Sequence, residues 1–268
     1  MPADFTPHRV PYLKQRPDTF RIREWAAANG HPVSERGRLA RHLIEAFFAA
    51  HPEVYEQAEK VEMVHATART PGPSPEDYGW VEGSRLRDIY TVAFVRGLDE
   101  REVLRRIGAA DEDIRMITDD DYSQPEGPEI VTVRRVGDWT IVVEDCGWRA
   151  SDLEGLCPLS RDGGEAVAVR RHDYAARHSL AYALDGAYVT DINPSFPVER
   201  HGTDPDRLNR HLRELGIDPA ADDHLDNPIP AAFAVAGRIT GVALRPEHLR
   251  RPVLGAAIPA PTDGEGPW

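Results

Sequence analysis

The sequence contains little cysteine and no long apolar run. Only two of its 268 residues are cysteines, Cys146 and Cys157. Their separation fits no metal-ligand spacing, and two thiols cannot build a disulfide framework, so both are expected to be reduced and buried. Because no run of about 18 apolar residues occurs, no membrane span is predicted, and the N-terminus lacks the basic and apolar parts of a secretion signal. Together these absences predict a cytoplasmic protein that has no membrane partner.

The motifs of common enzyme classes are also missing. No GxSxG, GxxxxGK[ST], GxGxxG or HExxH pattern occurs in the chain. Two acidic runs, residues 119–121 and 222–226, suggest a cation site, but acids in turns are usually solvated surface. His172, Asp173 and His178 are better explained by structural or surface roles than by catalysis. The sequence therefore predicts no catalytic residue, no metal and no cofactor, although it leaves the activity of the C-terminal part open.

Charge is distributed unevenly along the chain. The formal net charge is −13, yet residues 1–52 carry eight Lys or Arg against five Asp or Glu. The remaining 216 residues carry 24 basic and 40 acidic side chains. Hydrophobic residues make up 41% and charged residues 29%, which is ordinary for a folded protein. A basic N-terminal segment on an acidic body indicates that any contact with nucleic acid is made by that segment alone.

Two short helical patterns lie near the N-terminus. Apolar residues recur at helical spacing over residues 22–30 and 39–51, and Asn29-Gly30 is a typical helix end. The two patterns predict a small helix-loop-helix. Its expected core consists of Trp25, Val33, Leu43 and Phe47.

The C-terminal region combines strand and turn signals with a few helical patterns. Runs rich in β-branched residues are separated by the two-residue hairpin signals Gly137-Asp138 and Asp185-Gly186. Hairpins mixed with helices, without regular strand–helix alternation, predict an α+β fold with a mostly antiparallel sheet. Strands are expected at 90–95, 130–136, 139–143, 166–171, 178–184 and 187–192, and helices at 99–107, 153–159, 206–215 and 231–239.

Proline and glycine mark the expected boundaries. Four prolines occur among the first 17 residues, and three prolines and a glycine follow one another closely at 70–75. The last residues are also rich in proline and glycine. The predicted organisation is an irregular arm (1–17), a helix-loop-helix unit (18–65), a linker (66–85), an α+β domain (86–252) and a mobile tail (253–268).

The tripeptide Arg36-Gly37-Arg38 separates the two predicted N-terminal helices. A-tracts narrow the minor groove of DNA and deepen its negative potential, which favours an inserted guanidinium. The intervening glycine lets the backbone approach the groove floor. Such a reader distinguishes AT from GC pairs but not individual letters, because the minor-groove pattern is degenerate. Taken alone, the tripeptide is better explained as an exposed basic turn. Its sequence context decides between that explanation and a minor-groove reader.

That context is specific. From Ile22 to Arg38, the residues Trp25, Asn29-Gly30, Val33-Ser34 and Arg36-Gly37-Arg38 follow in a fixed order that resembles the C-terminal DNA-binding domain of the actinobacterial H-NS-like nucleoid-associated silencer proteins. The resemblance covers about residues 20–51. It implies a helix-loop-helix whose Arg36, Gly37 and Arg38 enter the minor groove of AT-rich double-stranded DNA, in transcriptional regulation or nucleoid association. Ser34 and Arg41 are added here as candidate phosphate contacts.

The region from about residue 86 to 250 resembles an uncharacterised domain of actinobacterial proteins. The resemblance rests on Arg96-Gly97-Leu98, the 182–191 hairpin and the 202–208 segment, and it implies no activity. Two alternatives therefore stay open beside DNA binding. In the first, the N-terminal unit is a docking element for a protein, including the acidic body of its own chain. In the second, the C-terminal domain is a small-ligand-binding or regulatory domain. Self-association or a protein partner through the C-terminal domain would add avidity.

Overall fold

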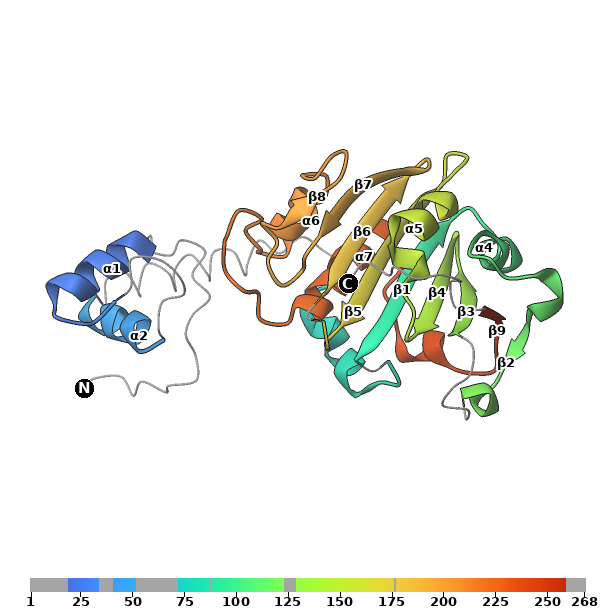
Figure 1. Cartoon of the computed structure of the whole chain (residues 1–268), viewed down its shortest axis with the longest axis horizontal. Helices are drawn as coiled ribbons and strands as arrows, with labels where there is room; N and C mark the ends of the chain where they lie inside the picture. Colours follow the sequence, from blue (N-terminus) through green and yellow to red (C-terminus); the bar gives the residue numbers. More distant parts are fainter. Residues whose placement is uncertain are drawn as a thin grey trace. The chain divides into compact units, whose positions relative to one another are not determined.

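In the computed structural model the chain divides into two units, Met1–Thr70 and Pro71–Trp268. The structure describes residues 19–33, 41–51, 72–86, 88–122, 129–175 and 177–258. The first unit is helical, and the second contains a nine-stranded antiparallel sheet with helices (Figure 1). The predicted α+β class is therefore confirmed.

The first unit contains two helices of ten residues, α1 (Thr19–Ala28) and α2 (Arg41–Ala50). Gly30 ends α1 with a positive φ of 74°, and the N–H of His31 donates to the carbonyl oxygen of Ala26 at 2.9 Å. This arrangement satisfies carbonyls that a helix end would leave without a partner. The buried core residues, which contact partly buried Trp25 and Val33, are Ile22, Ala26, Leu43 and Phe47.

The second unit is organised around β1, near the middle of the sheet. The strand order is β2-β9-β3-β4-β1-β5-β6-β7-β8, and every neighbouring pair is antiparallel. The two predicted hairpin turns connect β3 to β4 and β6 to β7, as expected. The strands are β1 (Ile89–Arg96), β2 (Arg115–Ile117), β3 (Glu129–Val136), β4 (Trp139–Asp145), β5 (Glu165–His172), β6 (Ser179–Leu184), β7 (Ala187–Ile192), β8 (Arg200–His201) and β9 (Val253–Ile258).

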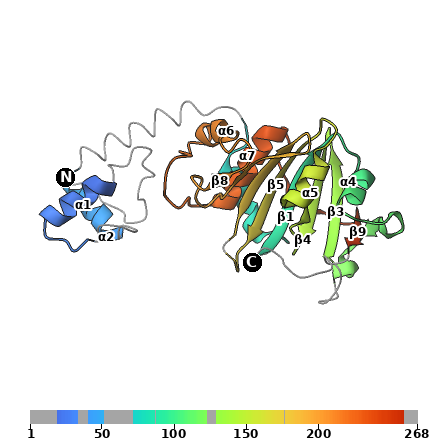
Figure 2. The ribbon, with the colours of Figure 1, turned by 45° about the horizontal axis from the view of Figure 1, so that its top comes forward.

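Helices cover both faces of this sheet (Figures 1 and 2). One face packs against α7 (Pro228–Thr240), together with α6 (Asn209–Glu214) and the 3-10 helices η1 (Pro75–Gly83) and η5 (Pro246–Leu249). The opposite face packs against α4 (Glu100–Arg106) and α5 (Leu153–Leu159). Three further 3-10 helices lie in the connections: η2 (Asp111–Asp113), η3 (Asp119–Tyr122) and η4 (Arg149–Ser151).

The two faces differ in side-chain size. Towards α7, the ring of Phe233 stacks on Tyr78 and Tyr90, with centroids 5.7 and 6.5 Å apart. Towards α5, strands β5 and β6 present only small residues over most of their length. These are Ala166, Ala168, Ala181 and Ala183, all completely buried. Short side chains let α5 lie close to the sheet, where Leu156 and Leu159 complete the packing.

Two predicted boundaries are wrong. The linker was expected to reach residue 85, but η1 lies within it, and its Tyr78 and Val81 are 1% and 0% exposed in the core. Proline is compatible with the first turn of a helix, so Pro75 does not prevent this structure. The tail was expected from residue 253, but β9 pairs there with β2 and β3. Both segments are recruited because the sheet offers them apolar surface and unpaired strand edges.

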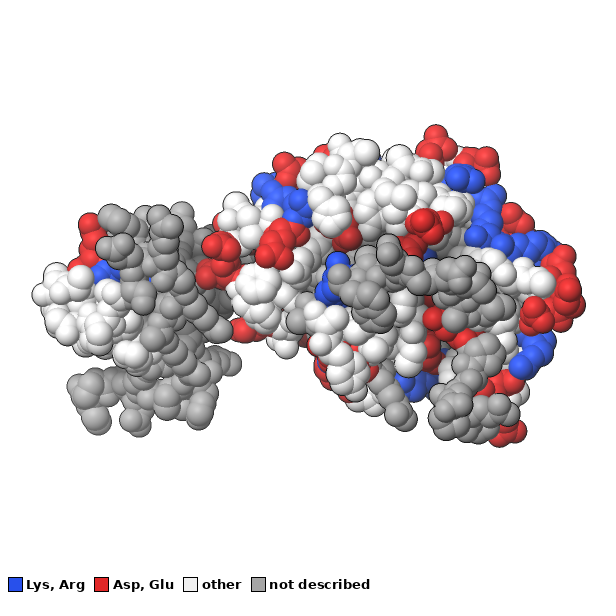
Figure 3. Space-filling model, in the orientation of Figure 1, with Lys and Arg blue, Asp and Glu red and all other residues white. Residues whose placement is uncertain are grey.

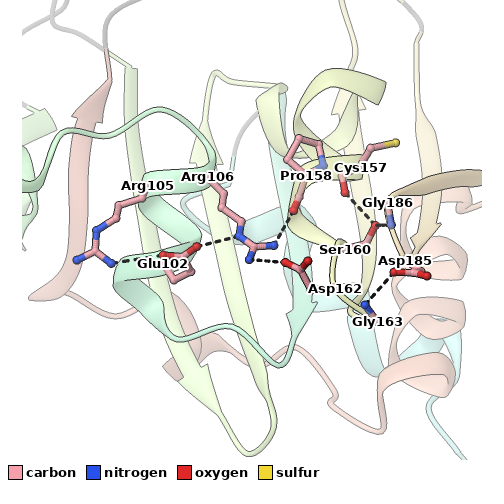
Figure 4. A network of polar contacts seen from close by, with 10 residues as sticks. All are labelled: Glu102, Arg105, Arg106, Cys157, Pro158, Ser160, Asp162, Gly163, Asp185 and Gly186. Carbon is pink, nitrogen blue, oxygen red and sulfur yellow. Dashed lines mark hydrogen bonds and ion pairs between the residues drawn. The ribbon is translucent and has the colours of Figure 1, made fainter.

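The position of α5 is fixed by arginine and by the β6–β7 turn (Figure 4). Arg106 of α4 donates to the carbonyl oxygen of Pro158 at 2.9 Å and also contacts Glu102 and Asp162. At the same end of α5, the Ser160 hydroxyl accepts the N–H of Gly186 at 3.1 Å. A cation and a strand turn therefore satisfy groups at the C-terminal end of α5, where carbonyls lack helical partners.

Gly155→Ala tests how tightly α5 is held. A Cβ atom at Gly155 would collide with the carbonyl oxygen of Arg149, whereas one at Gly79 would meet nothing within 4 Å. We expect Gly155→Ala to destabilise the fold by about 1–3 kcal/mol, and Gly79→Ala to stay within about 0.5 kcal/mol of the parent. Urea unfolding followed by circular dichroism measures both; equal effects of the two variants would contradict the close packing of α5.

Candidate nucleic-acid interface and polar cavity

An aromatic cluster holds together the two helices of the first unit. The Trp25 ring stacks on His31 with centroids 5.3 Å apart and meets Phe47 edge-on at 5.5 Å. Phe47 in turn lies 4.6 Å from His51. The Asn29 side chain donates to the carbonyl oxygen of Trp25 at 2.8 Å. These contacts join the end of α1 and the residues after it to α2. The segment between α1 and α2 therefore connects two helices that are packed together.

The predicted DNA-binding residues fall on that connection. Ser34, Arg36, Gly37 and Arg38 lie outside the described residues, which end at 33 and resume at 41. Arg41 is the first residue of α2. The five candidates are thus contiguous with, or part of, the segment that joins the two helices.

Several of the other sequence candidates have structural partners. Asp121 accepts the N–H of Thr118 at 2.7 Å and pairs with Arg115, and these contacts hold its carboxyl pKa well below its ordinary value. Asp173 pairs with Arg171 at 2.7 Å and lies 3.8 Å from His178. Across the described ranges, no three His, Cys, Asp or Glu side chains converge as metal ligands would. No described helix combines the length and apolar character needed to cross a bilayer. The two cysteines form no disulfide, but neither is buried as expected, because Cys146 is exposed and Cys157 is half-buried.

A row of polar side chains crosses the α5 face of the sheet, and sequence reasoning missed it. Cross-strand neighbours in the row are Glu144 with Thr91, Thr91 with Arg170, Arg170 with Ser179, and Asp191 with His201. All members except His201 lie in or directly beside an apolar run. Their alignment depends on the strand register, which no local pattern reveals. The row comprises Glu144, Thr91, Arg170, Ser179, Asp191 and His201.

One end of the row is buried and anchors the η4 turn. The Glu144 carboxylate, 1% exposed, accepts the N–H groups of Arg149 and Ala150 at 2.9 and 2.7 Å. Thr91 donates to the carbonyl oxygen of Gly147 at 2.9 Å. Burial raises the pKa of Glu144 to about 7, although the two N–H donors oppose that shift.

The other end of the row opens into a cavity of about 760 Å³. Asp191 accepts the Ser179 hydroxyl at 2.5 Å and the Tyr188 hydroxyl at 3.0 Å. Asp152 accepts the N–H of Gly155 at 2.8 Å and so caps α5. The polar residues lining the cavity include Ser151, Asp152, Cys157, Arg161, Arg170, Ser179, Tyr188, Asp191, His201 and Thr203.

Comparison with known families accounts for most of the chain. Residues 72–259 match a family of unknown function, DUF6461. The chain belongs to this family. Residues 14–50 match the Lsr2 DNA-binding domain, so a DNA-binding domain precedes the DUF6461 domain, and the resemblance seen in the sequence is confirmed. Neither the curated proteins nor the solved structures contain a match to this chain.

Glu144→Gln tests the buried end of the polar row in the DUF6461 domain. Glutamine retains one acceptor oxygen, so one of the two N–H groups of η4 loses its partner, which costs about 1–3 kcal/mol. The folded-state pKa of Glu144 lies above its unfolded value. The contribution of the protonated Glu144 carboxyl to the free energy of unfolding is therefore complete below the unfolded pKa and is lost as the pH rises through about 7.

Because glutamine does not titrate, the destabilisation by Glu144→Gln should be largest near pH 5 and smaller at pH 8. Urea unfolding of both proteins across this range measures the difference directly. A destabilisation that grows with pH would show instead that the fold stabilises the ionised carboxylate.

Proposed function

We propose that the Lsr2-type domain binds AT-rich double-stranded DNA by inserting Arg36 and Arg38 into the minor groove. The observation that carries this proposal is positional. Residues 14–50 match a DNA-binding domain, and within it Arg36-Gly37-Arg38 falls on the connection between α1 and α2.

The physical chemistry of the connection supports this assignment. Two guanidinium groups separated by one glycine match a groove whose negative potential is deepest where A-tracts narrow it. The glycine adds no side chain that would keep the backbone away from the groove floor. The helix α2 begins at Arg41, so its positive N-terminal dipole lies close in sequence to the inserted arginines. In this arrangement Ser34 and Arg41 contact flanking phosphates.

The distribution of charge assigns DNA contact to the first domain. Residues 1–52 have a basic excess, whereas the rest of the chain carries 40 acidic against 24 basic side chains. On the face drawn in Figure 3, acidic and basic side chains of the second unit are intermixed. A phosphate backbone gains little from such a surface. With only a few phosphates neutralised, binding by one copy is modest, and log K should fall with log salt with a slope of only about −2 to −3.

At the level of the cell, this activity corresponds to nucleoid association or to regulation of AT-rich promoters. Minor-groove readout separates AT from GC regions and does not define a unique sequence. The protein therefore marks regions of DNA by their shape and composition.

The double variant Arg36→Ala/Arg38→Ala should lose at least about tenfold in affinity for an AT-rich duplex, since both inserted cations are removed. Fluorescence anisotropy of the full chain on AT-rich and GC-rich duplexes, across a salt series, measures the loss. The matched control is Arg210→Ala/Arg213→Ala in α6, which removes two exposed arginines and changes the net charge equally.

Three results of this experiment would contradict the proposal. One is retention of AT-preferring binding by the Arg36/Arg38 variant. Another is an equal loss in the α6 control, which would indicate a general effect of charge. A third is the absence of duplex binding by the parent chain, which would favour the alternative that the N-terminal unit docks onto a protein.

A further inference from the structure

Arg170, the arginine of the polar row, has no hydrogen-bond or ion-pair partner among the described residues. It stands on β5 between Thr91 and Ser179, on the face where β5 and β6 also present four buried alanines. Its Nε atom is buried and has no hydrogen-bond partner. Within the described part of the chain, Arg170 forms no hydrogen bond and no ion pair within 4 Å. A half-buried cation that is left unpaired destabilises a fold, so its retention on this face needs another reason.

Two of the acidic groups that line the cavity with Arg170 are engaged elsewhere. Asp191 already accepts the hydroxyls of Ser179 and Tyr188, and Asp152 accepts the N–H of Gly155. Burial raises the pKa of Asp152, and the charge of Arg170 offsets only part of that shift. Arg170 therefore acts on Asp152 only at longer range, and neither carboxylate forms an ion pair with its guanidinium within 4 Å.

The rim of the cavity adds a second arginine and a histidine. Arg161 is exposed, and among the described residues it has no side-chain partner. The His201 imidazole is 75% exposed, with its Nε2 atom 3.7 Å from Asp191. Two of the three acids that line the cavity, Asp152 and Asp191, are thus bonded within the protein, and the third, Glu154, is exposed. The two arginines remain available to a ligand.

Two glycines allow close packing in the walls of the cavity. A Cβ atom at Gly202 would collide with the carbonyl oxygen of Val189, and one at Gly186 would lie 3.1 Å from the Arg161 side chain. Larger residues at these two positions would displace the rim. The volume of about 760 Å³ lies in the range of sites that hold a metabolite-sized molecule.

We propose that this cavity binds a small organic anion whose carboxylate or phosphate group pairs with Arg170 and, at the rim, with Arg161. Planar guanidinium groups suit both head groups because each offers two oxygens to a pair of N–H donors. The acidic excess of this part of the chain disfavours a polyanion such as DNA, so the site is separate from the proposed groove-reading arginines. The proposal does not depend on the DNA-binding function.

Arg170→Met tests this inference in the full chain. If Arg170 is kept for a ligand, removing its unpaired charge should raise the melting temperature of the ligand-free protein by roughly 2–6 °C. The control is Arg134→Met. Arg134 is a half-buried arginine of β3 that donates to the carbonyl oxygens of His248 and Arg250 at 3.1 and 2.7 Å. Its loss should lower the melting temperature.

Two probes then report on the site: inorganic phosphate and succinate, each titrated at constant ionic strength by calorimetry and thermal melting. Saturable binding to the parent chain and to Arg134→Met, weakened at least tenfold in Arg170→Met, is the expected result. Whichever probe binds more tightly identifies the head group. A lowered melting temperature for ligand-free Arg170→Met would assign a structural role to the arginine and overturn the inference, as would anion binding that is absent or unchanged by the variant.

Discussion

The structure of the second unit depends on a sheet that buries apolar side chains on both faces. Tyr90 to Val95 of β1 are buried without interruption, a pattern more typical of parallel sheets than of antiparallel ones. Such a sheet is stable only if helices cover it twice. One face is covered by the 13-residue α7, whose residues are mostly buried, and η1 packs beside it. The alanine-rich face is covered by α5, which has only seven residues. Because α5 is short, the outer strands β7 and β8 and one end of the polar row border the cavity that forms beside it.

Arginine has a consistent structural role in this chain. Of 32 basic residues only Lys14 and Lys60 are lysines. Many described arginines donate to carbonyl oxygens of distant segments, as Arg106 does to Pro158 and Arg200 to Pro219. The planar guanidinium makes these multidentate contacts where an ammonium group could not. Against this background an unpartnered arginine at the base of a cavity is informative. The two activities proposed for the protein, groove reading and anion binding, both use guanidinium groups.

The sequence predicted those elements whose signals are local. Asn29-Gly30 ended α1, Gly137-Asp138 and Asp185-Gly186 marked their hairpins, and Asp99 with Gly108 bounded α4, because each depends on the dihedral angles or capping of a few neighbouring residues. The segments η1 and β9 were missed because tertiary partners, not local propensity, order them. Their prolines and glycines resembled a linker and a tail.

The candidate sites differ in the same way. The Arg36–Arg38 tripeptide was identified because its neighbours follow a family pattern in linear order. Arg170, Ser179 and Asp191 carry no such pattern, and only the pairing of β5 with β6 and of β6 with β7 brings them together. Their role can be inferred only when it is known which side chains already have partners within the protein, since a charged residue near a strand end usually has a neighbour that neutralises it.

The central claim is that the chain recognises DNA through its first domain and a small anion through the cavity beside α5. Amide chemical shifts of the isotopically labelled full chain test it most directly, in separate titrations with an AT-rich duplex and with inorganic phosphate. The account predicts that the duplex perturbs resonances within residues 14–51 and that phosphate perturbs those of Arg161, Arg170 and their strand neighbours. Duplex-induced shifts centred on residues 72–258, or phosphate-induced shifts away from the cavity, would contradict it.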